Sequence, residues 1–279
     1  GNTTTSLRWN HLFNEKLFMN TTVFYSNYDY LLDSDLSDSN DQDSFRWQSN
    51  IENYSVKPDF QYFINPKNTL SFGGQSIYYR FNPGQAEAVS GGETVNIGLP
   101  DKYAVESALY LSNEQKINDK LSIQYGIRYS DYRYIGEGNE VLLNDAGVTP
   151  GERKNVTSIN KISSGKVIQQ YGNWEPRFSA NLGLSSNSSM KLSYNRLAQY
   201  VHLLSNTAAS SPLDVWTPSS NNIKPQIADQ LALGYFTNFS DNTYEASVEV
   251  YYKKLQNQID YVRNADLLLN SAVEADLLS

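Results

Sequence analysis

The chain has 279 residues, a formal net charge of −8, 39% hydrophobic residues and no cysteine. This length suits one all-β domain, and the acidic balance argues against nucleic-acid binding. The lack of cysteine excludes disulfides, thiolate metal sites and cysteine nucleophiles. No stretch approaches the roughly 20 apolar residues of a transmembrane helix, so a helical membrane protein is excluded.

Short and long polar segments alternate along the sequence. The short ones predict tight turns at Phe13–Lys16, Asn65–Asn68, Asn113–Lys120, Ser185–Ser189 and Asn238–Asn242. The longer ones lie at Leu31–Ser44, Asn82–Asp101, Ile135–Gly172, Val201–Lys224 and from Val262 to the end. Connections that are short at one end of a sheet and long at the other are typical of outer-membrane β-barrels.

The segments between these connections alternate apolar and polar residues with a period of two, which predicts strands. In Lys120–Asp131 the odd-numbered residues from Leu121 to Tyr129 are apolar, and the even-numbered residues opposite them are polar or glycine. The other predicted strands are Thr3–Leu12, Leu17–Tyr30, Phe45–Tyr54, Tyr54–Phe63, Leu70–Phe81, Lys102–Ser112, Trp174–Leu184, Met190–Leu197, Ile227–Thr237 and Tyr244–Lys253. Phe45–Tyr54 and Tyr54–Phe63 can also be one continuous strand. We therefore expect an antiparallel up-and-down meander of about ten strands. A short helix is expected within Asn264–Leu278.

The apolar face of these strands has two interpretations. In a β-sandwich it is the core, and in a membrane barrel it contacts lipid. Strand length favours the barrel, because strands in globular proteins usually run about 5–6 residues and a tilted membrane strand needs about 9–11. The 21 tyrosines suit either interpretation, since tyrosine fits both strands and membrane boundaries.

A series of motifs occurs in order from Trp174 onward. They are Trp174–Ser179, Met190–Arg196, Gln199–Thr207, Pro212–Trp216, Ile223–Gln226, Leu233–Phe236, Val250–Lys253 and Asn257–Tyr261. This series resembles the barrel of TonB-dependent outer-membrane receptors of the Bacteroidetes type. The resemblance is strong over residues 174–261, and residues 1–173 match it in hairpin rhythm and tyrosine content.

The resemblance implies a barrel of about 22 strands in the bacterial outer membrane, plugged by an N-terminal domain. It implies import of a scarce nutrient, such as a siderophore or glycan, powered by the inner-membrane TonB complex through the plug. Residues 1–279 are then one partial barrel domain without the plug. The implied partners are a small-molecule or oligosaccharide ligand, outer-membrane lipid and a surface lipoprotein, with no cofactor. Ten strands leave two unpaired edges, so we expect the isolated chain to need detergent, self-association or rearrangement.

Three residues in one long segment are the candidate ligand contacts. Trp216 is the first, because aromatic faces stack on sugar rings and aromatic siderophores; anchoring its own loop is the alternative role. Tyr200 and His202 begin the same segment. A packing role is favoured for His202, because metal sites rarely use a single histidine.

Other candidates have simpler explanations. The carboxylate-rich stretch Asp33–Asp43 offers the oxygen ligands that Ca²⁺ prefers, but Asp38 and Ser44 break the EF-hand pattern, which favours a solvated loop. Glu245 and Glu249 would lie about 13 Å apart at ~3.3 Å per residue, too far for a glycosidase pair. We therefore expect no enzyme and no metal site.

The polar strand faces complete the functional prediction. Arg128, Arg177 and Glu249 should line the passage of a nutrient transporter. Two alternatives remain: a passive outer-membrane porin or surface adhesin, and a soluble β-sandwich ligand-binding module. The sandwich alternative requires the Leu121–Tyr129 face to be buried in a protein core.

Overall fold

The computed structural model describes residues 1–35, 44–90, 93–204, 215–239, 241, 243–262, 265 and 270–278. Ten antiparallel strands form the main sheet, in the order β1-β2-β3-β4-β6-β7-β10-β11-β14-β15. They are β1 (Asn2–Leu12), β2 (Leu17–Asp35), β3 (Ser44–Asn65), β4 (Asn68–Ser90), β6 (Lys102–Lys116), β7 (Leu121–Ile135), β10 (Val167–Gly183), β11 (Ser188–Gln199), β14 (Gln226–Phe239) and β15 (Tyr244–Gln256). The predicted ten-stranded up-and-down meander is confirmed.

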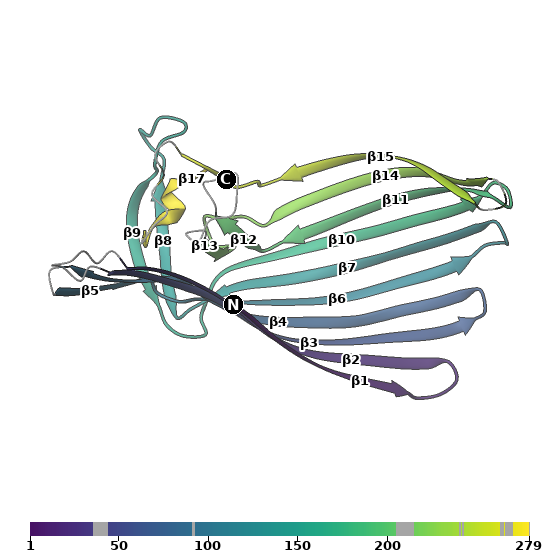
Figure 1. The fold of residues 1–279 in the computed structure, drawn as a ribbon, viewed down its shortest axis with the longest axis horizontal. Helices are drawn as coiled ribbons and strands as arrows, with labels where there is room; N and C mark the ends of the chain where they lie inside the picture. Colours follow the sequence, from purple (N-terminus) through teal and green to yellow (C-terminus); the bar gives the residue numbers. More distant parts are fainter. Residues whose placement is uncertain are drawn as a thin grey trace.

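The tight turns lie at one end of the sheet and the long connections at the other (Figure 1). Asparagine side chains build three of these turns. The Oδ1 atoms of Asn14, Asn65 and Asn118 each accept a hydrogen bond from a backbone N–H two residues later, at 2.9 Å in every case. Asparagine closes such turns because its short side chain can replace a backbone acceptor. Local sequence therefore sets the sidedness of the meander.

The long connections contain more strands than the sequence predicted. The additional strands are β5 (Glu93–Gly98), β8 (Gly138–Asn144), β9 (Asn155–Ile162), β12 (Val201–Leu204), β13 (Val215–Pro218), β16 (Asp260–Tyr261) and β17 (Leu277–Leu278), and a 3-10 helix covers Val273–Asp276. The segment Asn82–Asp101, predicted as a long polar connection, instead extends β4 and returns as β5. The helix lies within the predicted Asn264–Leu278 segment.

The two faces of the sheet differ in chemistry. The outer face presents apolar side chains such as Leu109, which is 71% exposed, and the exposed Tyr125, Ile127 and Tyr129. No described element covers them, so the β-sandwich alternative is wrong. The inner face holds the polar residues and a buried aromatic cluster that includes Phe81 and Tyr132.

The first and last strands of the sheet are its edges. Every residue of β1 and β15 is exposed, and among the described residues each strand pairs with a single neighbour, β2 and β14 respectively. Unpaired edges are templates for pairing with another chain. The expectation that the isolated chain needs detergent or self-association stays a prediction.

Candidate functional site

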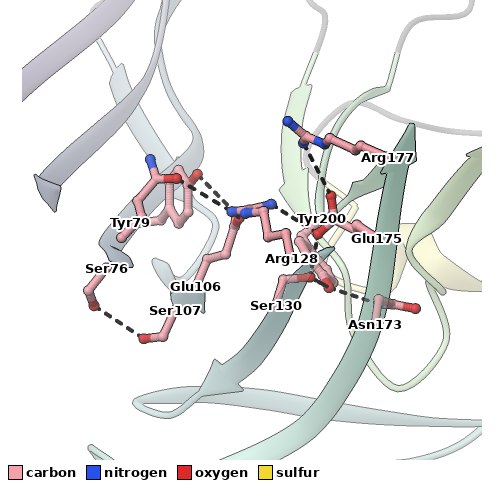
Figure 2. Close-up of polar contacts among 11 residues, drawn as sticks. Ser76, Tyr79, Glu106, Ser107, Arg128, Ser130, Asn173, Glu175, Arg177 and Tyr200 are labelled. Carbon is pink, nitrogen blue, oxygen red and sulfur yellow. Dashed lines mark hydrogen bonds and ion pairs between the residues drawn. The ribbon is translucent and has the colours of Figure 1, made fainter. Parts of the chain in front are cut away.

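Arg128 lies at the centre of a charged network on the inner face (Figure 2). The β7–β10 register places it directly opposite Glu175. Its Nη1 lies 3.0 Å from Glu175 Oε1, and its Nη2 lies 3.1 Å from Glu106 Oε1 on β6. Arg128 is 17% exposed and Glu175 only 1%, so these charge-assisted hydrogen bonds are largely withdrawn from water. One guanidinium on β7 thus binds two carboxylates, one on each of the neighbouring strands β6 and β10.

Hydrogen bonds extend this network beyond the charged groups. The Ser130 hydroxyl donates to Glu175 Oε1 at 2.8 Å and lies 2.6 Å from the hydroxyl of Tyr200. Asn173 Nδ2 donates to the same Tyr200 hydroxyl at 2.8 Å. Tyr200 follows β11 directly, so the network joins the sheet to the segment that leaves it.

Glu175 has one oxygen with a weaker environment. Its Oε2 has no hydrogen-bond partner, and Arg177 Nη2 lies 3.9 Å away. The Arg177 side chain is half-exposed, and its guanidinium points toward Glu175 (Figure 2). It is therefore a more loosely held cation than Arg128.

A groove of about 600 Å³ runs along the inner face beside this network. Arg128 and Arg177 line one part of it, and Lys57, Asp59 and Tyr110 line another. The Tyr110 hydroxyl donates to Asp59. The groove is thus lined by charged and polar groups of both signs, as expected of a surface that faces water or a polar ligand.

The three predicted ligand residues come together at the other end of the network. Tyr200 is buried and stacks on Tyr132, with ring centroids 4.7 Å apart and an interplanar angle of 1°. His202 is 2% exposed, and its Nε2 lies 2.8 Å from Ser219 Oγ. Burial lowers the pKa of His202 to about 4, which keeps the ring neutral.

Trp216 occupies a less enclosed position. It is half-buried and packs against the aromatic cluster of the inner face. Its strand partner is Leu203, the residue after His202, and it packs in the same aromatic cluster as Tyr200. Tyr200 and His202 have little contact with solvent in this arrangement, so ligand contact by these three residues stays a prediction.

Sequence reasoning found some of the network and missed the rest. Arg128 and Arg177 lie on the inner face, as predicted. Glu249 has the same inward direction, because the register carries this face from Arg177 through Asn195 and Gln230 to Lys253, four residues from Glu249, but it lies on the edge strand β15 and outside the network. Sequence reasoning missed Glu106 and Ser130. The alternation along their strands directs both side chains to the inner face. Only the register across β6, β7 and β10 shows that they meet Arg128 and Glu175.

The acidic stretch is only partly described. Asp33 lies in β2 and pairs with Arg46 on β3 at 3.0 Å. Asp38, Asp41 and Asp43 lie outside the described residues. Within the described residues, no group of three or more histidine, aspartate or glutamate side chains could hold a metal ion. The same residues include no helix that is long and apolar enough to cross a membrane.

An up-and-down antiparallel sheet with an apolar outer face and a polar inner face is the wall of a β-barrel. The sequence matches the family model "TonB dependent receptor-like, beta-barrel" over residues 1–272, so the chain belongs to this family. Members of this family are outer-membrane proteins. No curated protein matches the sequence.

Solved structures of several receptors share the fold. The copper transporter OprC aligns with a TM-score of 0.64 and 11% identity, over 92% of this chain and 40% of that one. FpvA of P. aeruginosa, solved with pyoverdines bound, aligns with a TM-score of 0.59 and 13% identity, over 93% of this chain and 33% of that one. The FrpB iron transporter of Neisseria meningitidis aligns with a TM-score of 0.59 and 9% identity, over 94% of this chain and 37% of that one.

These likenesses have two consequences. At such low identities they show the fold alone. The chain also spans 40% or less of the length of each of these three proteins, so the ten-stranded sheet corresponds to part of a receptor barrel.

Proposed function

We propose that this chain is the barrel portion of a TonB-dependent outer-membrane transporter, of the Bacteroidetes type, that imports a scarce nutrient such as a siderophore or a glycan. The observation that carries the proposal is the contrast between the two sheet faces. Leu109 and its outer-face neighbours suit lipid, whereas Arg128, Glu106 and Glu175 form a polar inner wall. The family match supports an energised receptor over a passive porin or an adhesin.

The proposed route begins at the end of the sheet with the long connections. The ligand, a small molecule or oligosaccharide, is captured there and passes along the polar inner face. Trp216 is the first contact we propose, because its half-buried ring is the most accessible of the three candidates. Tyr200 and His202 become contacts only when their segment moves, since both are buried. TonB through a plug, outer-membrane lipid and a surface lipoprotein are the proposed partners.

An uptake experiment tests this function. Cells that produce the receptor containing this chain are compared with a strain that lacks its gene and with a strain that lacks TonB. Each is supplied with labelled ferric siderophores and, separately, with labelled oligosaccharides. A transporter predicts uptake of one class that disappears in both mutant strains. Uptake that persists without TonB would indicate a passive porin, and no uptake of either class in any strain would contradict the proposal.

A further inference from the structure

The strand pair β12–β13 and the bend that follows it cross the inner face of the sheet. We call residues 201–204 and 215–223 the inner hairpin. It leaves the sheet after β11 and rejoins it at β14, yet β13 lies against β3, β4 and β6 on the other side of the network. Thr217, Ser219 and Ser220 are buried, and Ile223 packs in a separate cluster with Leu204, Val273 and Leu277. The inner hairpin therefore spans the space in front of β7 and β10.

The inner hairpin is attached to the wall by side chains. Its two strands form a sheet of their own, and no strand ladder joins that sheet to the ten-stranded one among the described residues. By contrast, β5 is paired with β4 along its whole length. An element without a backbone ladder to its neighbours can separate from them without breaking the sheet.

Three tyrosines contribute to this attachment, and we call them the tyrosine clasp. The Nδ2 atoms of Asn221 and Asn222 also donate to the carbonyl of Val141 on β8, at 2.8 and 2.7 Å. The Tyr132 hydroxyl on β7 donates to the carbonyl of Ser219 at 2.9 Å. The Tyr171 hydroxyl on β10 donates to the carbonyl of Ser220 at 2.6 Å. Tyr200 stacks on Tyr132 at the base of the inner hairpin. Lys102 adds a hydrogen bond to Thr217 Oγ1 at 3.2 Å.

The closed position also has an internal cost. Among the described residues, His202 Nδ1 and Asn221 Oδ1 are buried without a hydrogen-bond partner. A buried polar atom without a partner loses the hydrogen bonds that water would provide. Both atoms belong to the inner hairpin, so moving it into water would relieve both.

We propose that the inner hairpin is a gate on the inner face, that the tyrosine clasp holds it closed, and that its release uncovers Tyr200, His202 and the Arg128 network. Trp216 moves with it. The gate deepens the proposed transport function, because ligand passage is the event that would use it. Its closed state is also tied to the network, since the Ser130 hydroxyl contacts both Tyr200 and Glu175.

Thiol labelling measures the opening directly. The chain contains no cysteine, so a thiol introduced by Ser220→Cys is its single thiol, at a position that is 1% exposed when the gate is closed. The receptor that contains this chain is purified in detergent, and the rate of maleimide labelling is measured. In this background, Tyr132→Phe with Tyr171→Phe removes the two hydroxyl bonds while keeping the rings. One net hydrogen bond shifts an opening equilibrium roughly two- to ten-fold, so we expect labelling to accelerate on the order of ten-fold.

Tyr134→Phe is the matched control. Tyr134 is buried on the same face of β7, and its hydroxyl makes no hydrogen bond to the described part of the inner hairpin. Its labelling rate should stay within about two-fold of the background. Equal rates in the double variant and the background would overturn the gate, and so would equal acceleration by Tyr134→Phe. Loss of the strand signal in circular dichroism in the double variant would also overturn it, because the tyrosines would then hold the wall. Labelling requires no transport, so a failure of uptake would refute the function without changing this result.

Discussion

The ten-stranded sheet and the inner hairpin are built by different kinds of contact. The sheet is held by continuous backbone ladders between neighbours in the meander, such as the β6–β7 and β7–β10 pairs. The inner hairpin is held by side-chain contacts: tyrosine hydroxyls, a ring stack and a lysine from distant strands, and its own Asn221 and Asn222, which donate to Val141. A ladder resists local opening, whereas a few side-chain contacts can be exchanged for others. The difference suggests a rigid wall that supports a movable inner element.

The charged network beneath the inner hairpin should show the largest effect. Arg128→Ala leaves Glu175 buried without its close cation, and removing one partner of a buried ion pair typically costs about 3–5 kcal/mol. We expect the free energy of unfolding, measured by urea titration in micelles, to fall by about this amount. Arg177→Ala is the control, because its side chain is half-exposed and 3.9 Å from Glu175, and should cost about 0–1 kcal/mol. Equal costs would show that Arg128 is not the cation on which Glu175 depends.

The two faces of the wall should respond differently to one added charge. Leu111 lies on the outer face of β6, and Gln124 on the inner face of β7 beside the groove. A lipid-facing arginine near the bilayer midplane costs about 2–4 kcal/mol, whereas an inner-face arginine remains in water. Leu111→Arg should therefore reduce folding into lipid vesicles, measured by the heat-resistant folded fraction, and Gln124→Arg should not. A larger loss of the folded fraction in Gln124→Arg than in Leu111→Arg would mean that the two faces are assigned the wrong way round.

The buried histidine should make the stability of the protein depend on pH. Because burial lowers the pKa of His202 to about 4, the unfolded chain takes up a proton below about pH 6.5 and the folded chain does not. The contribution of neutral His202 to the free energy of unfolding is therefore fully present above about pH 6.5. It is lost as the pH falls toward 4, by up to about 3 kcal/mol. Unfolding titrations at several pH values should show this loss, and His202→Gln should remove it. An unchanged pH dependence in the variant would mean that His202 titrates freely.

Much of the ten-stranded sheet could be predicted from the sequence. Few of the contacts that attach the inner hairpin to it could be predicted. Alternation in Lys120–Asp131 predicted both the strand and its two faces, because side-chain direction has a period of two along a strand. Asn14 and Asn118 lie in the predicted turns Phe13–Lys16 and Asn113–Lys120, and the structure shows that they close these turns by local hydrogen bonds. By contrast, the bond from Tyr171 to Ser220 joins residues of two predicted long connections, and nothing in either segment indicates the other.

The candidate site divides in the same way. The inward direction of Arg128 followed from its own strand, but its contact with Glu106 and Glu175 depends on how three strands are aligned. Trp216, Tyr200 and His202 were chosen for their residue types in one long segment. That choice could not show that Tyr200 and His202 would be buried. Their burial depends on Tyr132 of β7 and on Ser219, which the β12–β13 pairing brings back beside His202.

The orientation of the wall is the central claim, and a thiol scan along β7 tests it most directly. Single cysteines at Ser122, Ile123, Gln124 and Tyr125 are labelled with a fluorophore, and the protein is folded into bilayers that contain lipid-attached nitroxide quenchers. The outer face should contact lipid, so quenching should be strong at Ile123 and Tyr125 and weak at Ser122 and Gln124. Uniform quenching, or the reverse alternation, would contradict the assignment of this sheet as a barrel wall with its polar face inward.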